Sequence, residues 1–203
     1  MEIVQRSEET VDLRLDHPIW DRVFTVAPLV VVGTRDAAGN YDLEPKHLAL
    51  PLGSGPYFGF VSTERHSTYR NIKRDRFFTV SFPNPSSVVV TSLISSPRRE
   101  GRKKPALKAL PMTRASTIDA MFVADSYLFL ECELDRIVSG FGENCLISGI
   151  IRRAAVNKES LRLFELDDQV MLERRPILAF LPPERYAVLK STRPFPFPDG
   201  TRH

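Results

Sequence analysis

The sequence predicts a mostly β protein, built as a small closed antiparallel barrel with a few peripheral helices, and three observations support this fold class. In Ser126–Leu134, apolar side chains alternate with polar ones at a period of two, which is typical of a half-buried strand. The β-branched run Leu29–Thr34 ends at a turn-like stretch, residues 36–40, which indicates a hairpin. Strands and helices do not alternate regularly along the chain, so a doubly wound α/β fold is not expected.

Four strands are expected in the first half of the chain. Leu29–Thr34 should pair with a return strand that starts at Tyr41. Tyr57–Val61 follows a turn rich in glycine, serine and proline. Phe77–Phe82 is stopped by Pro83, because proline cannot donate to a ladder.

Helical signals are fewer than strand signals. Asp16–Arg22 begins with a capping aspartate and has an early proline, and Lys104–Leu110 is amphipathic. Another short helix is expected to start near Ser67, where a Ser or Thr hydroxyl can accept from unpaired first-turn amides. Ser86–Ser95 follows polar capping residues, but its three consecutive valines favour a strand, so helix and strand both remain open.

The second half of the chain returns to strands. Ser126–Leu134 places Glu131 and two further acidic side chains on the face opposite its leucines, the polar face of the strand. Asn144–Ile151 is another apolar run, and Ile177–Leu181 with Tyr186–Leu189 completes the series.

The last residues contain two phenylalanines, Phe195 and Phe197, placed between prolines. Proline excludes a helix here and leaves an extended segment. Because exposing two phenylalanines is unfavourable, we expect this segment to dock on the barrel.

Length and composition indicate one domain in the cytoplasm. With 203 residues and 42% hydrophobic content, the chain can bury a full core, and we expect residues 1–203 to form a single domain. No apolar run is long enough to cross a bilayer, and the polar, acidic N-terminus does not resemble a signal peptide. Cys132 and Cys145 lie in strand-like apolar runs without metal-type spacing. We therefore expect a cytoplasmic protein with two buried free thiols, no metal site and no membrane contact.

Positive charge gathers in one short stretch of a chain whose formal net charge is +3. Its basic residues are Arg98, Arg99, Arg102, Lys103, Lys104 and Lys108. Proline and glycine mark the stretch as a loop, and it has no aromatic side chains on which bases could stack. A solvated loop is therefore favoured over a nucleic-acid site, although such a loop can also steer an anionic ligand.

The most informative stretch, residues 59–72, joins an apolar strand to a polar turn and a helix start. Arg65 and His66 follow hydroxyl-bearing residues and precede the helix expected from Ser67. A helix start supplies free N–H groups and a partial positive charge, and Arg65 adds a full one. This combination predicts a phosphate-binding loop. The alternative is an ordinary capped helix with solvated charges.

Residues that carry a family resemblance occur in the same order along the chain. They are Val30–Asp36 with Gly39–Asn40, then Glu44–Gly53 leading to Tyr57–Ser62 and His66–Ile72, then Leu128–Leu134 with Gly142–Gly149, and finally Leu178–Tyr186 with Phe195–Pro198. Together, residues 24–198 resemble the flavin reductase-like family, whose members have an FMN-binding split barrel of antiparallel, Greek-key-like strands. No single segment is diagnostic, but their common order makes coincidence improbable.

The resemblance implies a homodimer that binds FMN, or FAD in some relatives, near the subunit interface. The phosphate is then held by the loop after the strand and by the helix start, which correspond to Ser62, Thr63, Arg65, His66, Ser67 and Thr68. The isoalloxazine edge is implied to meet Lys46, His47, Leu48 and Ala49, largely through backbone groups. No catalytic residue is assigned, because the flavin itself carries the chemistry.

The sequence departs from the family pattern at two places. Lys46 and His47 stand where many relatives have small polar residues. A cation near N1 and O2 of the flavin would stabilise the reduced, anionic form and raise its potential. The alternative places Lys46 in solvent and packs His47 in the barrel wall. Asn144 stands where many flavin reductases carry a histidine that is thought to assist nicotinamide binding.

These observations support an FMN-dependent oxidoreductase of the flavin reductase type, which takes electrons from NAD(P)H and passes them to an unidentified acceptor. The alternative is an FMN-binding electron carrier without nicotinamide activity, which Asn144 and the Lys46-His47 pair favour. A nucleic-acid-associated protein is supported only by the basic loop.

Overall fold

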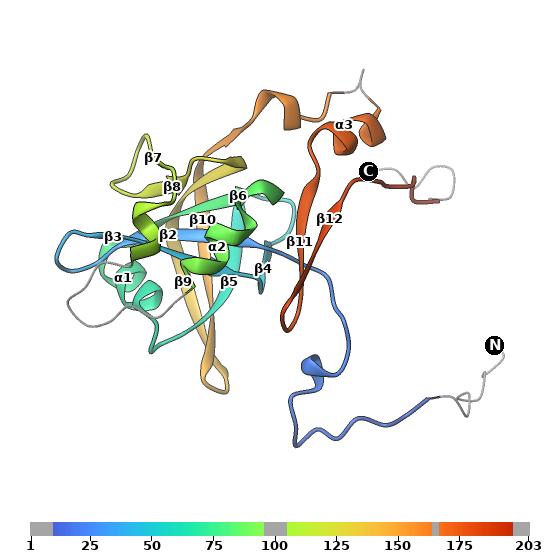
Figure 1. The fold of residues 1–203 in the computed structure, drawn as a ribbon. Coiled ribbons are helices and arrows are strands. Elements are labelled where there is room, and N and C mark those ends of the chain that lie inside the picture. Colours follow the sequence, from blue (N-terminus) through green and yellow to red (C-terminus); the bar gives the residue numbers. More distant parts are fainter. Residues whose placement is uncertain (1–9, 96–104, 164–166, 197–203) are drawn as a thin grey trace.

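A curled antiparallel sheet of seven strands forms the body of the protein (Figure 1). We describe it from a computed structural model, in which residues 10–95, 105–163 and 167–196 are placed. In spatial order the strands are β3 (Tyr41–Lys46), β2 (Val30–Arg35), β6 (Phe77–Pro83), β9 (Ser126–Phe141), β10 (Asn144–Val156), β5 (Tyr57–Thr63) and β4 (Ala49–Pro51). Every neighbouring pair is antiparallel, which confirms the predicted fold class.

The two end strands of this sheet belong to one bent segment. β3 pairs with β2 and β4 pairs with β5, yet only His47 and Leu48 separate β3 from β4 in the chain. The Leu48 carbonyl oxygen already accepts from the Val61 amide at 2.8 Å. The barrel is therefore split at a bend of the chain, where the segment leaves one half of the sheet and joins the other.

The barrel interior is filled by side chains from both halves of the sheet. Its cluster of buried residues includes Val30, Phe58, Phe60, Phe78 and Ile147, with aromatic pairs such as Phe60 and Phe78 at 5.5 Å between ring centroids. Cys132 and Cys145 are free and buried, as predicted. Burial raises the pKa of the Cys132 thiol to about 12.

The outer face of β2 is also covered, which the sequence did not predict. A second buried cluster packs Val31 and Leu43 against Val123 of β8 (Met121–Val123) and against residues that follow α2 (Val88–Leu93). The layer comprises 3₁₀ turns at Pro85–Ser87 and Pro105–Lys108, α2, and the hairpin of β7 (Met112–Arg114) with β8. It lies so close that a Cβ on Gly33 would stand 2.3 Å from the Met121 carbonyl oxygen.

This outer layer changes the position expected for Glu131. The side chain is only 1% exposed, because the Ser116 and Thr117 amides donate to its carboxylate at 2.9 and 2.7 Å. Arg153 Nη1 contacts the same carboxylate at 3.1 Å. Glu131 thus lies on the face opposite the leucines, as the alternation predicts, but this face is covered by the loop at residues 115–120 and is not open to solvent there.

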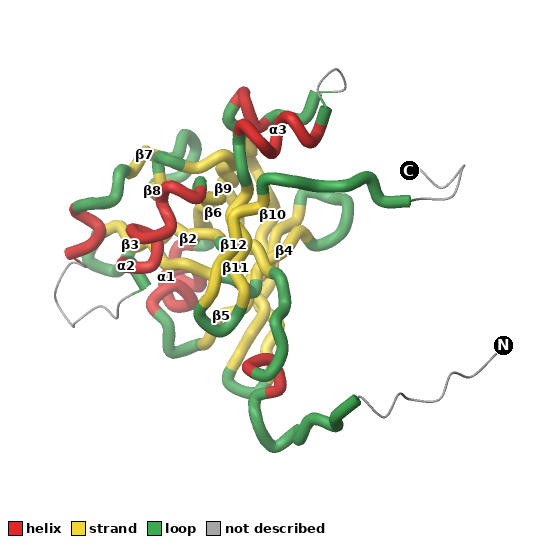
Figure 2. The backbone as a smooth tube through the Cα atoms, turned by 45° about the vertical axis from the view of Figure 1, so that its right-hand side comes forward, coloured by secondary structure: helices red, strands yellow, loops and turns green. Residues whose placement is uncertain are grey.

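A second, smaller sheet stands beside the barrel. It contains β1 (Ala27–Pro28), β11 (Ile177–Leu181) and β12 (Arg185–Leu189) in the order β1-β11-β12. Figure 2 shows the neighbouring strands β11 and β12. The strands β11 and β12 match the prediction, whereas α3 (Asp168–Arg174) was not foreseen. A 3₁₀ turn, Lys158–Ser160, lies between β10 and α3 in the chain.

The predicted helices are confirmed unevenly. α1 (Ser67–Asp75) begins where expected, and Ser86–Ser95 is helical, since its three valines fall at or inside the start of α2. Asp16–Arg22 contains only the 3₁₀ turn Ile19–Asp21. Of Lys104–Leu110, the described part forms a 3₁₀ turn, and Arg98–Lys104 of the basic loop lie outside the described residues.

The segment before β1 runs away from the sheet in Figure 1 and leaves Trp20 and Phe24 64% and 67% exposed. Phe195 is 71% exposed in a single chain, and Phe197 lies outside the described residues, so docking of this segment beside a bound ligand or a second subunit stays a prediction. No helix among the described residues is both long and apolar enough to span a bilayer.

Candidate functional site

The bend between β3 and β4 separates the four residues predicted to meet the flavin ring. Lys46, the last residue of β3, is only 8% exposed and lies on the α1 side of the strand. His47 lies half-buried against Phe180 of β11, with ring centroids 4.8 Å apart. Leu48 is 52% exposed and Ala49 is buried. One sequence-based alternative placed Lys46 in solvent and His47 in the barrel wall. His47 is packed as this alternative states, whereas Lys46 is buried.

The start of α1 is capped differently from the prediction. The N-cap residue is His66, not Ser67 or Thr68, and its side chain makes no capping hydrogen bond. The Ser67 hydroxyl instead donates to Asp42 Oδ2 at 2.9 Å, across to β3. The amides of the first helical turn have no intrahelical acceptor and carry the positive end of the helix dipole. The helix start therefore offers N–H groups that a side chain does not cap.

A compact polar cluster forms where β3 meets this helix start. Lys46 Nζ lies 3.2 Å from His66 Nδ1. Asp42, which precedes Lys46 by four residues on β3, lies on the same face of the strand and is 1% exposed. The cluster thus joins one buried cation, one buried carboxylate, an imidazole and the Ser67 hydroxyl. Asp42 was not recognised in the sequence, because an acidic residue gives no signal for a phosphate site.

Two predicted phosphate ligands carry hydroxyls that are buried without a partner. Ser62, near the end of β5, and Thr68, in the first turn of α1, are 4% and 0% exposed. Neither Ser62 Oγ nor Thr68 Oγ1 has a hydrogen-bond partner in the described structure. A buried hydroxyl without a partner is costly, so these two atoms are available to bind a polar ligand.

Arg65 points away from this cluster. Its guanidinium pairs with Glu143 at the tip of the β9–β10 hairpin at 2.9 Å, and both side chains are at least 70% exposed. Thr63 lies directly opposite Asn144 in the ladder between β5 and β10. The segment Gly142–Gly149 of the family resemblance is therefore adjacent in space to the segment that leads into α1, although 78 residues separate Arg65 from Glu143.

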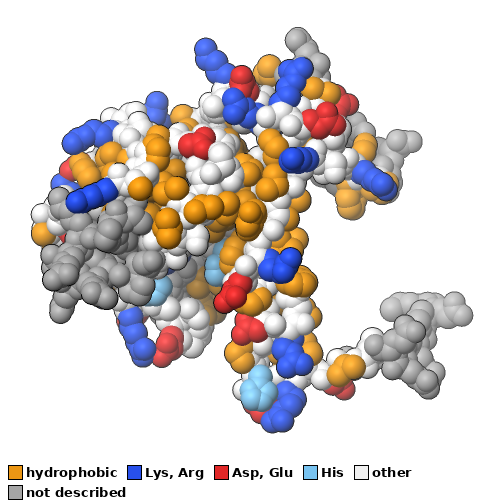
Figure 3. Space-filling view, in the orientation of Figure 1, with side chains coloured by type: hydrophobic (Ala, Val, Ile, Leu, Met, Phe, Trp, Pro, Cys, Tyr) orange, Lys and Arg blue, Asp and Glu red, His pale blue; other side chains and the backbone are white. Residues whose placement is uncertain are grey.

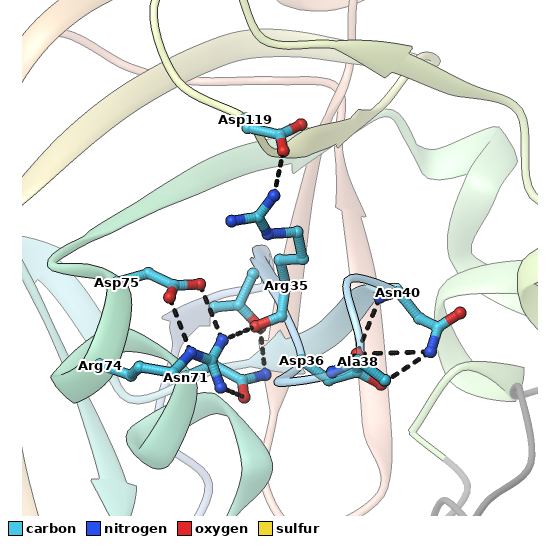
Figure 4. A network of polar contacts seen from close by, with 9 residues as sticks. Arg35, Asp36, Ala38, Asn40, Asn71, Arg74, Asp75 and Asp119 are labelled. Carbon is cyan, nitrogen blue, oxygen red and sulfur yellow. Dashed lines mark hydrogen bonds and ion pairs between the residues drawn. The ribbon is translucent and has the colours of Figure 1, made fainter.

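The opposite end of α1 is fixed by a network that the sequence did not reveal (Figure 4). Asn71 Nδ2 donates to Thr34 Oγ1 at 3.0 Å, and the Arg74 guanidinium donates to the Arg35 carbonyl oxygen. Arg74 also pairs with Asp75 at 2.7 Å, which lowers the pKa of that carboxyl. These contacts hold α1 against the β2–β3 hairpin and so fix the helix start relative to Lys46.

A cavity of about 530 Å³ opens on the other side of the bend, at His47. It lies between α2 and the β11–β12 hairpin, where Figure 3 shows hydrophobic side chains gathered on the surface. Pro45, His47, Phe180 and Tyr186 line it together with Thr91, whose buried Oγ1 has no partner among the described residues. Burial, and then the nearby Lys46 charge, lower the pKa of His47, which keeps this imidazole neutral at pH 7.

These features fit the cofactor that the sequence resemblance implies. The helix start, Lys46 and the unpartnered hydroxyls of Ser62 and Thr68 suit a phosphate, and the aromatic cavity at His47 is large enough for a three-ring heterocycle. Among the described residues, no group of three or more His, Cys, Asp or Glu side chains is arranged to hold a metal ion.

Comparison with known protein families agrees with the geometry. Residues 23–170 match the flavin reductase like domain. The chain belongs to the flavin reductase-like family. No curated protein sequence gives a significant match.

Solved structures share the fold of this flavin reductase-like protein. Nitrilotriacetate monooxygenase component B from Bacillus cereus superposes with a TM-score of 0.79 at 16% identity, over 93% of this chain and 100% of that chain. Flavoredoxin from Desulfovibrio vulgaris (Miyazaki F) gives a TM-score of 0.73 at 21% identity, over 97% and 100% of the two chains. A protein assigned as a flavin reductase with a split barrel domain, from Shewanella frigidimarina NCIMB 400, gives 0.74 at 19% identity, over 85% and 87%. At these identities the likeness concerns the fold.

Proposed function

We propose that this protein is an FMN-dependent oxidoreductase of the flavin reductase type, which accepts electrons from NAD(P)H and passes them to a further acceptor. The observation that carries the proposal is the bend at His47 and Leu48. It lies between a cationic, hydroxyl-rich helix start and an aromatic cavity. A phosphorylated ligand with a flat ring system needs these two environments close to each other in space, one for the phosphate and one for the ring.

In this proposal the two sides of the bend divide the binding of the cofactor. The α1 start, with Lys46, His66 and the hydroxyls of Ser62 and Thr68, holds the phosphate. The backbone from Lys46 to Ala49 and the wall formed by His47 and Phe180 orient the ring and exclude water from one face. Bound FMN supplies hydride acceptance and one-electron release, so the chain itself needs no acid–base pair.

We further propose a homodimer of single-domain subunits in the cytoplasm. Family membership implies flavin binding, and the exposed side chains of Trp20, Phe24 and Leu48 offer apolar surface that a second subunit can bury. Binding of FAD should be tested together with binding of FMN, because some family members use FAD as the cofactor.

A second function, an FMN-binding electron carrier without nicotinamide activity, is supported by one position. Asn144, where many flavin reductases have a histidine, lies opposite Thr63 in the ladder beside the proposed phosphate loop. The fold shared with flavoredoxin is compatible with this function.

The visible absorption spectrum of the purified protein, after incubation with FMN and removal of unbound flavin, tests the proposal. We expect bands of oxidised flavin, which bleach when NADH or NADPH is added without oxygen. Flavin bands that bleach with dithionite but with neither nicotinamide would favour the carrier. Absence of bound flavin, together with an unchanged melting temperature in excess FMN and FAD, would refute both functions.

A further inference from the structure

Another cavity lies at the end of the β11–β12 hairpin opposite its turn. It has a volume of about 490 Å³ and lies near α3, which Figure 1 shows at the upper end of both strands. Three basic side chains line it, those of Arg174, Arg175 and Lys190, and among its described lining residues only Asp125 is acidic. We call it the cationic cavity, to distinguish it from the aromatic cavity at His47.

Both cavities lie along the same face of the hairpin. Phe180 and Tyr186 are directly opposite each other in the β11–β12 ladder, and both line the aromatic cavity. Side chains two residues apart in a strand share a face, so Val188 and then Lys190, the first residue after β12, follow Tyr186 on this face. Val188 and Lys190 line the cationic cavity. The four residues from Tyr186 to Lys190 span about 13 Å of extended chain.

The opposite wall of both cavities is also a single segment. The 3₁₀ turn Pro85–Ser87 lines the cationic cavity with Ser86, and α2, which follows it directly, lines the aromatic cavity with Thr91. The same two elements therefore bound both cavities. We call the two cavities together the groove, which has an aromatic end at His47 and a cationic end beside α3.

The cationic end has positive charge to offer to a ligand. Arg174 and Lys190 are exposed, and neither makes an ion pair with another described residue, whereas Arg175 pairs with Glu159. A guanidinium and an ammonium group that converge on one cavity are suited to a phosphate, because both donate charge-assisted hydrogen bonds to its oxygens.

Asp125, the acidic residue of the cationic end, is already engaged by its neighbours. Its carboxylate accepts from Asn84 Nδ2 at 2.6 Å and from the Ser86 and Ser87 hydroxyls at 2.6 and 2.8 Å. Sites for NAD commonly use an acidic side chain to bind the ribose 2′-hydroxyl, whereas an arginine accommodates the 2′-phosphate of NADP. The composition of this end therefore resembles the second arrangement.

We propose that the groove binds NADPH, with the 2′-phosphate at Arg174 and Lys190, and that these two residues make the protein selective for NADPH over NADH. This inference rests on the proposed function, because the nicotinamide has to reach the flavin ring at the aromatic end. In NADPH the pyrophosphate follows the nicotinamide after one ribose, and the 2′-phosphate is carried by a second ribose beyond it. The 2′-phosphate is thus the group that reaches the far end of the groove, and NADH has no group to place there.

The first test measures KM and kcat for bleaching of bound FMN by each nucleotide without oxygen. The unaltered protein should have a lower KM for NADPH than for NADH. Arg174→Gln and Lys190→Gln should each raise the KM for NADPH roughly tenfold, the effect of one charge-assisted hydrogen bond, and leave kcat and the KM for NADH unchanged. Arg152→Gln is the matched control, because Arg152 is an exposed arginine on β10 that lines neither cavity.

The outcomes separate the inference from the proposed function. Equal KM values for the two nucleotides in the unaltered protein would overturn the inference and leave the oxidoreductase intact. A weaker affinity for FMN in Arg174→Gln would also overturn it, because the cationic end would then hold the phosphate of the flavin. Bleaching by neither nucleotide would refute the proposed oxidoreductase itself.

A binding measurement tests the cationic end without any turnover. Isothermal titration calorimetry should show that adenosine 2′,5′-bisphosphate binds the unaltered protein roughly tenfold more tightly than adenosine 5′-monophosphate, which lacks the 2′-phosphate. The difference should disappear in Arg174→Gln and persist in Arg152→Gln. Equal affinity of the two nucleotides for the unaltered protein, or a difference that survives in Arg174→Gln, would contradict the assignment of the 2′-phosphate to this end.

Discussion

Glu131 offers a sharp test of how the outer layer is attached to the barrel. Its carboxylate accepts from the Ser116 amide at 2.9 Å, the Thr117 amide at 2.7 Å and the Thr117 hydroxyl at 2.5 Å, and it contacts Arg153 at 3.1 Å. Glu131→Ala removes the acceptor from all of these donors at once. Glu131→Gln keeps the shape of the side chain but turns an amide group toward them.

The expected loss follows from burial and from the number of donors. A hydrogen bond to a charged group contributes about 1.5–3 kcal/mol, but the exposed Arg153 and part of the loop regain water when the carboxylate is removed. The free energy of unfolding should therefore fall by about 3–5 kcal/mol in Glu131→Ala, because two amides and the Thr117 hydroxyl lose a charged acceptor at a covered site. Glu133→Ala, two residues along β9, removes an exposed carboxylate paired with Arg152 and should cost about 0–1 kcal/mol.

Urea denaturation followed by circular dichroism measures both values. Burial alone would raise the pKa of Glu131, but hydrogen bonds from Thr117 and Ser116, together with Arg153, outweigh it and lower the pKa below its ordinary value of 4.5. A lowered pKa means that this stabilisation is present above pH 4.5 and is lost as the pH falls through the folded-state pKa. Glu131→Ala should thus lose part of the acid sensitivity of the native protein. A loss below about 1 kcal/mol at pH 7, equal to that of Glu133→Ala, would refute the reasoning.

Three further outcomes are expected. In Gly33→Ala the new Cβ would stand 2.2 Å from Thr79 Oγ1, so overpacking should lower the free energy of unfolding by about 1–3 kcal/mol or more; unchanged urea denaturation would contradict the close approach of the two layers. Arg65→Glu should weaken FMN binding by at most about 1 kcal/mol, because Arg65 is exposed, pairs with Glu143 and can act on the ligand only across solvent; an unchanged fluorescence titration would mean that this charge does not act on the ligand. Because burial raises the pKa of both Cys132 and Cys145, neither thiol should react with a thiol reagent at pH 8 until the protein is unfolded, and fast labelling of the native protein would show that the core opens.

The sequence predicts the strands of the barrel well, because each carries its own apolar pattern. The elements missed are those whose stability comes from partners far along the chain. The three-residue strands β7 and β8 have no periodicity to detect, and they are held by contacts such as the Thr79 hydroxyl on the Met121 carbonyl oxygen. α3 did carry a local signal, since Asp167 caps it by accepting from the Gln169 amide. However, a helix of 7 residues is too short to show a clear amphipathic pattern.

The candidate site shows the same division between local and distant information. Residues 62–68 are contiguous and chemically distinctive, so their clustering at the helix start is visible in the sequence. The contact between Lys46 and His66 spans 20 residues and depends on how β3 is packed against α1. Phe180 reaches His47 from the far end of the chain, and no spacing in the sequence indicates that pair.

The bend at His47 and Leu48 has a mechanical consequence. Because one short segment supplies both ends of the sheet, the β2–β3 and β4–β5 ladders are joined only through these two residues at that point. A ligand that contacts both sides of the bend holds the two ladders together, and its binding free energy opposes separation of either ladder. Hydrogen exchange of backbone amides in β3 and β4 should then slow together when the ligand binds, while the β9–β10 ladder in the middle of the strand order changes little. Occupancy of the site and closure of the barrel would be a single equilibrium.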